Sequence, residues 1–251
     1  MARRPSSAAQ PDPNAPTPAA AEPAAAPPSG PKQTIEAALL ALLTEKPWGE
    51  IGLFEIAERA GVSLAELRAA FPSKGAILAG FVRRIDIEVL RHDARDMADE
   101  PARERLFDVL MRRLEALAPH RPALRAVRRG LSVDPLGAAA MNQVAVSSMQ
   151  WMLAAAGVQE SGPVGTARAQ ALVLVNARVF DVFLNDEDES LARTMKALDE
   201  ELRKAERWAR RADDAFRLTA PFRAVFDRAI GRRRRSRDED EPLARDDAAA
   251  A

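Results

Sequence analysis

The sequence predicts an all-α fold, and three observations carry this prediction. Apolar residues recur at helical spacing through most of the chain between residues 34 and 230. No segment alternates apolar and polar residues over the length of a β-strand, and the breaks between helical segments hold Pro, Gly or short acidic turns. With 251 residues, of which 47% are hydrophobic, the chain is long enough to bury a sizeable core.

The first helices are marked by their end signals. A Leu-rich segment follows Thr34, which is a candidate N-cap, and "LFEIAERAG" predicts a second, short helix that ends at Gly61. Ser63 is followed three residues later by Glu66, the pattern of a capping box, so a third helix is expected directly after Ser63. Two short helices joined by a Gly turn are typical of a helix-turn-helix unit.

The later helices form a longer series. They are expected at 74–98, 101–118, 121–130, 135–156, 164–185, 188–212 and 214–230. The segment 164–185 is apolar on more than one face, which predicts burial on both sides. In 188–212, a narrow apolar seam is expected to face another helix, either of the same chain or of a second subunit; it consists of Leu191, Met195, Leu198, Leu202 and Ala205.

The two ends of the chain differ in composition from the middle. Residues 1–31 are rich in Pro, Ala and Ser, which predicts a disordered arm, and residues 231–251 begin with an Arg run and then turn acidic, which predicts a disordered charged tail. Prolines interrupt every Ala run near the N-terminus, and no stretch of about 18 apolar residues exists, so neither a secretory signal nor a membrane-spanning helix is expected.

Composition narrows the possible chemistry. The 37 basic and 37 acidic residues cancel, so any binding to nucleic acid must come from a local patch. The absence of Cys excludes disulfides and thiolate metal sites and fits a cytoplasmic protein, and the two His, at 92 and 120, are expected at the surface. No metal and no cofactor is predicted. The acidic run 186–189 is expected to complement the dipole of the following helix.

Residues 34–81 carry a specific combination of motifs. "EIAERAGVS", the spacing from Leu67 to Phe71, "FPSK" and a Leu-rich first helix followed by Trp48 occur in this order. In this combination the segment resembles the N-terminal DNA-binding domain of the TetR/AcrR family of bacterial repressors. The resemblance implies a helix-turn-helix head over 32–84 and a helical body over 85–230 that dimerises and often encloses a small ligand.

The same resemblance implies the residues that meet DNA. They are Arg68 and Lys74, together with Ser63, Leu64 and Ala69 on the reading helix. The sequence departs from the family pattern here, because Arg68, Ala69 and Ala70 stand where the family commonly has Tyr and then His, Tyr or Arg. Residues 32–85 carry seven positive and six negative charges, and the arginines at 3, 4 and 232–235 are possible additional contacts.

A ligand pocket is expected among the body helices. Its candidate lining residues are Met141, Met149, Trp151, Met152, Asn176 and Phe180. A cluster of Met and aromatic residues is also typical of an ordinary core, and this alternative stays open at the level of sequence.

Two functions follow from these observations. The leading hypothesis is a homodimeric, ligand-responsive repressor that binds a palindromic operator, and no catalytic residues are predicted because the chain has no phosphate-binding loop, nucleophile elbow or zincin helix. The alternative is a lipid carrier with a degenerate head. Residues 180–211 resemble ubiquinone-biosynthesis accessory proteins that share the TetR fold, and 214–230 is expected to be a basic amphipathic helix, suited either to a membrane surface or to the core.

Overall fold

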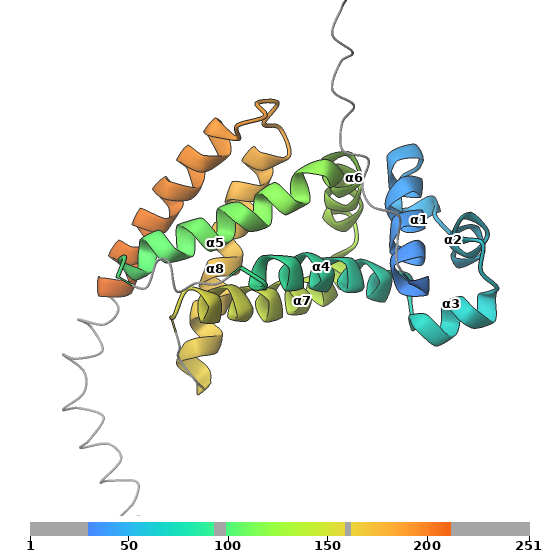
Figure 1. Ribbon diagram of the computed structural model, residues 1–251, viewed down its shortest axis with the longest axis horizontal. Helices are drawn as coiled ribbons and strands as arrows, with labels where there is room; N and C mark the ends of the chain where they lie inside the picture. The colour runs from blue at the N-terminus through green and yellow to red at the C-terminus, as the bar shows by residue number, and fades with distance from the viewer. Residues whose placement is uncertain (1–29, 93–98, 159–161, 212–251) are drawn as a thin grey trace, which may run out of the picture.

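The computed structural model of the chain describes residues 30–92, 99–158 and 162–211. Every regular element within these ranges is a helix, which confirms the predicted all-α class (Figure 1). The predicted helix 214–230, the charged tail and the arginines near both termini lie outside the described residues, as does all of the N-terminal arm before residue 30.

Four short elements pack together at one end of the molecule, and we call them the head. They are α1 (Pro31–Glu45), the 3₁₀ turn η1 (Trp48–Glu50), α2 (Leu53–Ala60) and α3 (Leu64–Ala70), shown in blue and cyan in Figure 1. The prediction that Thr34 caps α1 is wrong, because the N-cap is Gly30 and Pro31 occupies the first turn, where its missing N–H costs nothing. Thr34 lies inside the helix, and its hydroxyl donates to the Gly30 carbonyl at 3.2 Å.

The head is held together by an apolar core. Its central members, each at most 7% exposed, are Ile35, Leu39, Leu42, Ile56, Ala57, Leu67 and Phe71 from the head and Ile77, Leu78 and Phe81 from α4 (Lys74–Leu90). At about 25 cal/mol per Å² of buried apolar surface, side chains of this size supply most of the free energy that orients three such short helices.

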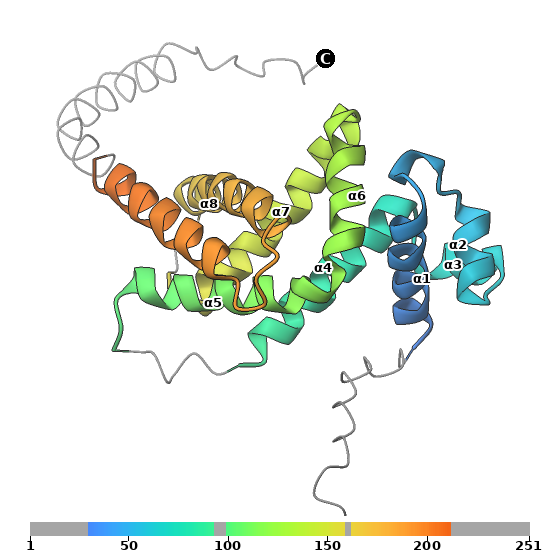
Figure 2. The same cartoon turned by 90° about the horizontal axis from the view of Figure 1, so that it is seen from above.

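Helix α4 leads from the head into the remaining helices, which we call the body. These are α5 (Ala102–Leu117), the 3₁₀ turn η3 (Ala118–His120), α6 (Arg121–Ser132), α7 (Pro135–Ala155), α8 (Gly162–Phe183) and a helix over 192–211. Helices α4 and α7 run side by side, as Figures 1 and 2 both show, and α8 packs on α7. The predicted bounds agree closely, except that α4 ends at Leu90 instead of residue 98; residues 93–98 lie outside the described ranges.

The two predictions about packing in the last helices had different outcomes. The prediction that α8 is buried on both sides is wrong for the single chain. Leu172 and Val179 are buried, but Val164 and Leu174 are 59% and 57% exposed. The seam on the helix over 192–211 packs largely inside the chain. Its members Leu191, Leu198 and Leu202 are at most 3% exposed and Ala205 is partly buried, whereas Met195 is 41% exposed.

The loop between α8 and the last described helix is organised by one buried carboxylate. Oδ2 of Asp186, which is fully buried, accepts hydrogen bonds from the backbone N–H of Thr194 at 2.8 Å and from its hydroxyl at 2.7 Å. Burial acts to raise the pKa of Asp186, but these hydrogen bonds and one from the Asp188 amide outweigh it and hold the pKa below its usual value. Asp186 therefore satisfies one of the free N–H groups, that of Thr194, in the first turn of the helix that follows.

Two kinds of feature are absent from the described part of the chain. None of its helices combines the length and the apolarity needed to cross a bilayer. Within residues 30–92, 99–158 and 162–211, no three His, Asp or Glu side chains lie close enough together to hold a metal ion.

Candidate nucleic-acid interface and ligand cavity

Helix α3 is positioned by local signals at its start. Gly61 adopts a left-handed conformation with φ of 66°, which a Cβ would strain, and this turn separates α2 from α3. The Ser63 hydroxyl accepts from the Glu66 N–H at 3.2 Å, and the Glu66 carboxylate accepts from the Ser63 N–H at 2.7 Å. The Ser63 hydroxyl also donates to this carboxylate at 2.8 Å, and the hydrogen bonds that the carboxylate accepts from the Ser63 N–H and hydroxyl lower the pKa of Glu66. The predicted capping box is confirmed.

One side of α3 is buried and the other faces solvent. Leu67 is 2% exposed and anchors the helix in the head core. Leu64 is 48% exposed, and Arg68 and Ala69 are exposed with it. Ser63 uses its hydroxyl in the capping box, so its role in the structure is to fix the start of α3.

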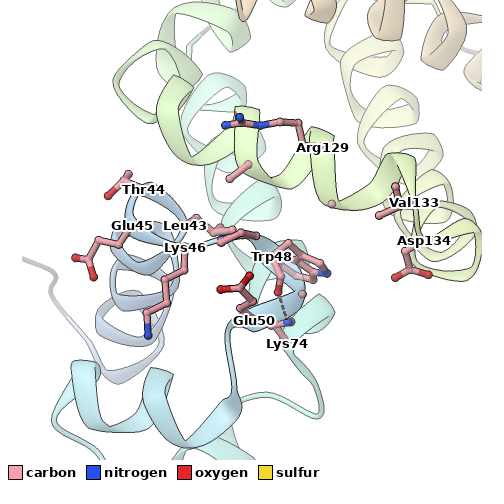
Figure 3. Close-up of a pocket in the computed structure, with 14 residues that line it drawn as sticks. Leu43, Thr44, Glu45, Lys46, Trp48, Glu50, Lys74, Arg129, Val133 and Asp134 are labelled. Carbon is pink, nitrogen blue, oxygen red and sulfur yellow. Dashed lines mark hydrogen bonds between the residues drawn. The ribbon is translucent and has the colours of Figure 1, made fainter.

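Arg68 and Lys74 have different surroundings. Arg68 is exposed and donates a hydrogen bond from Nη1 to the Pro72 carbonyl at 2.9 Å. The ammonium of Lys74 donates to the carbonyls of Trp48 at 2.6 Å and Ile51 at 2.8 Å and lies 4.5 Å from the centre of the Trp48 ring (Figure 3). Burial lowers the pKa of Lys74. Lys74 thus ties η1 to the start of α4.

Three of the seven cations between residues 32 and 84 are engaged by acids of the same segment. The ion pairs are Lys46 with Glu55, Arg59 with Glu45, and Arg84 with Glu36. The Arg59 pair is bidentate, with both distances 2.7 Å. The first two pairs lie at the surface, where such pairs contribute little to stability, so their cations can exchange partners at small cost. In the third pair Glu36 is only 6% exposed.

A close contact joins the head to the body beside a pocket of about 820 Å³ (Figure 3). A Cβ atom at Gly130 of α6 would lie 2.5 Å from the Cβ of Trp48 in η1, which is closer than side chains approach. Gly130 is therefore required for α6 to pack against Trp48. Through Trp48, the same contact reaches the Lys74 ammonium at the start of α4.

A second cavity, of about 370 Å³, lies inside the body. Helices α4 to α8 all contribute to it, and most of its lining is hydrocarbon: Leu78, Val82, Leu117, Leu124, Val127, Leu131, Ala138, Met141, Val144, Ala145, Val173, Ala177 and Phe180. This volume and apolar lining are typical of small-molecule sites, which span roughly 300–1,000 Å³.

Four polar side chains line this cavity, and three of them have partners. Arg113 is 6% exposed and donates from Nε to Asp86 at 2.9 Å, and Arg128 pairs with Asp181 at the same distance. Asn142 exchanges hydrogen bonds with Gln170 at 3.1 and 3.2 Å. The amide of Asn176 has no hydrogen bond among the described residues, which leaves it available to a ligand.

Comparison with known proteins relates this architecture to one fold. No model of a protein family matches the sequence, and no curated protein is significantly similar to it. The crystal structure of a TetR transcriptional regulator from Nitrosomonas europaea matches 70% of this chain and 97% of its own, with 24% identity and a TM-score of 0.56. The chain has the TetR fold. A TetR regulator from Rhodococcus sp. RHA1 covers 68% of this chain and 93% of its own at 23% identity, with a TM-score of 0.46.

Within this TetR fold, the predicted ligand residues fall into three places. Met141, Asn176 and Phe180 line the cavity of the body. Met149 and Met152 are at most 1% exposed and belong to the packed core. Trp151 is 58% exposed and lines a groove between α4 and α7 on the surface. Helical spacing alone does not say which face of α7 meets the cavity, and this explains the division.

Two side-chain contacts in this chain differ from what its sequence predicts: one was not predicted, and the other contradicts a prediction. The buried pair Asp86–Arg113 was not predicted, although Arg113 lies three residues after Leu110 and four before Leu117, on the apolar face of its helix. A surface position for His120 was predicted, but its ring packs edge-on to Phe81 at 4.9 Å. Burial, followed by repulsion from Arg84, lowers the pKa of His120, while Glu88 acts in the opposite direction.

Proposed function

We propose that this protein is a DNA-binding transcriptional regulator that acts as a homodimer and releases or engages its operator in response to a small apolar effector. The observation that carries the proposal is α3. It is fixed at its start by a capping box, anchored by Leu67 and exposed along its opposite side. A short helix held in this way at the tip of a TetR fold is suited to enter a major groove.

The test is a screen of genomic DNA fragments with the full-length protein at moderate salt, followed by variants. Arg68→Ala is expected to weaken binding to the selected operator by about 1–3 kcal/mol. Arg207→Ala, which removes the same charge from an exposed position on the last described helix, serves as the control and is expected to leave affinity unchanged. Failure of the full-length protein to prefer any DNA sequence contradicts the proposal.

Lys74 needs a separate interpretation. Its predicted phosphate contact stays a prediction, but two of its three N–H donors are used by backbone carbonyls. Lys74→Ala is therefore expected to lower stability as well as affinity, and its effect on DNA binding should be compared with its effect on the melting temperature.

The salt dependence of binding gives a further readout. Lys46, Arg59 and Arg84 each have to leave an acid partner before they neutralise a phosphate, which lowers their net contribution to binding. The logarithm of the binding constant falls by roughly 0.9 per neutralised phosphate for each unit of log salt. We expect a shallower slope than that of regulators with six to ten phosphate contacts per complex.

The dimer is proposed to form along α8. Its exposed side carries a stripe of small and apolar side chains at helical spacing: Val164, Ala167, Ala171 and Leu174. An apolar stripe on an otherwise well-packed chain favours burial against a second copy. Leu174→Glu is expected to convert the dimer to a monomer in sedimentation experiments, whereas Leu136→Glu, at an 85% exposed position on α7, is expected to leave it intact.

The effector is proposed to occupy the body cavity with its apolar part, and to bind Asn176 with a polar end. Ala145→Phe fills the cavity and is expected to remove the response of operator binding to effector without abolishing operator binding itself.

The alternative function, a lipid-binding accessory protein, is favoured by one observation: three of the seven cations between residues 32 and 84 are paired with acids of the same segment. It predicts an apolar molecule that co-purifies with the full-length protein in native mass spectrometry, is lost in Ala145→Phe, and is unaffected by DNA. Sequence-preferring operator binding decides against this alternative as the main function.

A further inference from the structure

The solvent side of α3 has an unusual composition for a helix that reads DNA. Leu64, Ala65, Arg68 and Ala69 are all exposed, and at 100° per residue they share an arc of about 140°. Leu67 lies outside this arc and is buried. Three of the four side chains on the arc are hydrocarbon, and Arg68 lies within it between Leu64 and Ala65.

The polar side chains next to this arc are unable to read bases. The hydroxyl of Ser63 and the carboxylate of Glu66 are committed to each other and to backbone N–H groups at the start of α3. No Asn or Gln, which would recognise adenine, occurs between Ser63 and Ala70. Base-edge hydrogen bonding from this helix is left to Arg68.

Hydrocarbon side chains match one group in the major groove. Thymine presents its C5-methyl there, while the other bases present hydrogen-bonding edges that an apolar side chain would desolvate. Arginine matches guanine, whose N7 and O6 both accept. On this basis, and resting on the proposed DNA-binding function, we propose that α3 reads a thymine-rich half-site through methyl contacts to Leu64, Ala65 and Ala69, with one guanine contact from Arg68.

Arg68 is suited to the guanine contact by its position. Its Nη1 donates to the Pro72 carbonyl at 2.9 Å, which restrains the side chain near the end of α3. The remaining N–H groups of the guanidinium stay available for a base edge, and the positive charge favours approach to the polyanion. A restrained arginine loses less conformational entropy on binding than a free one.

The experiment uses the full-length protein and the operator selected from genomic DNA. Each thymine of a half-site is replaced in turn by deoxyuridine, which lacks only the methyl group. The expected result is about a fourfold loss of affinity at each contacted thymine, from the burial of one methyl. Thymines outside both half-sites are the DNA control and are expected to show no change.

Matched variants assign the contacts to residues. Leu64→Ala is expected to abolish the deoxyuridine effect at one position, and Leu136→Ala on α7, which is equally a loss of an exposed Leu, is expected to preserve it. Replacing the half-site guanine by 7-deazaguanine removes N7 and should weaken binding about fivefold or more for the wild type, but not for Arg68→Ala.

The outcomes separate this inference from the function on which it rests. Tight, sequence-preferring binding that is indifferent to deoxyuridine overturns the thymine readout and leaves the regulator proposal standing. Absence of any sequence-preferring binding overturns both. If base substitutions in the half-site weaken binding equally in the wild type, Leu64→Ala and Arg68→Ala, then residues other than Leu64 and Arg68 read the bases, and the thymine readout is overturned.

Discussion

Two ion pairs, one in the head and one in the body of this molecule, differ in their exposure to solvent. In the head, Arg59 and Glu45 pair at the surface with both side chains at least 40% exposed. In the body, Asp86 and Arg113 pair with side chains 8% and 7% exposed. An exposed pair can exchange its partner for a phosphate or water, whereas a buried pair has no substitute when one member is lost. The Arg59–Glu45 pair can thus change its partners, and the Asp86–Arg113 pair is fixed.

The two regions also offer hydrocarbon in different shapes. A cavity of about 370 Å³ between the body helices is lined largely by hydrocarbon, while α3 of the head leaves Leu64 48% exposed. The comparison indicates that the two regions suit different partners: a small molecule held between helices, and an extended surface that α3 meets from outside.

The largest effect is expected from breaking the buried pair. Arg113→Met leaves Asp86 without its partner in the body, and we expect the free energy of unfolding to fall by about 3–5 kcal/mol in urea denaturation. The double variant Asp86→Leu/Arg113→Met should recover most of this loss. A single variant as stable as the wild type would show that Asp86 gains another partner.

The next effect concerns the junction of head and body. Gly130→Ala places a Cβ 2.5 Å from that of Trp48, and the resulting overpacking is expected to cost about 1–3 kcal/mol. In a Trp48→Gly background, which removes the opposing Cβ as well, the same change should be neutral or stabilising, since Ala favours the helix. Gly75→Ala in α4, where the nearest atom lies at 3.8 Å, is the control and should not destabilise.

Asp186 is expected to make the body sensitive to acid. Its pKa is lower in the folded protein than in the unfolded chain, so its contribution to stability is present above the unfolded pKa and is lost as the pH falls through the folded pKa. Asp186→Asn should flatten this part of the pH profile of the melting temperature. An unchanged profile would show that the hydrogen bonds from Thr194 do not depend on the charge.

His120 is expected to give a smaller effect nearer neutral pH. Its pKa is also lowered on folding, so the neutral ring is favoured in the native state and stability falls as the pH drops through the ordinary histidine range, from about 7 to 5. His120→Gln should remove this dependence. His92→Gln, at an exposed position, is the matched control and should retain it.

The smallest effect is expected from the exposed pair of the head. Arg59→Ala removes a bidentate contact with Glu45, and the change in melting temperature should lie within the scatter of the measurement. A clear loss of stability would show that the head depends on its surface ion pairs, and the contrast with the body would disappear.

The sequence by itself determined the local structure of this protein. The Gly61 turn, the capping box at Ser63 and the apolar positions of α1 to α3 were predicted correctly, because each depends on residues within about four positions of one another. The helix bounds of the body followed from the same short-range rules, and so did the helix-turn-helix arrangement of the head.

Only the tertiary structure decided how those helices use their side chains. It directed the Lys74 ammonium to two backbone carbonyls, packed His120 against Phe81, buried Arg113 beside a cavity and exposed one side of α8. Each of these depends on which helix faces lie together across tens of residues. The spacing of apolar residues shows which face of a helix is apolar, but it does not show which other helix packs against that face. Packing and burial are therefore decided by the tertiary structure.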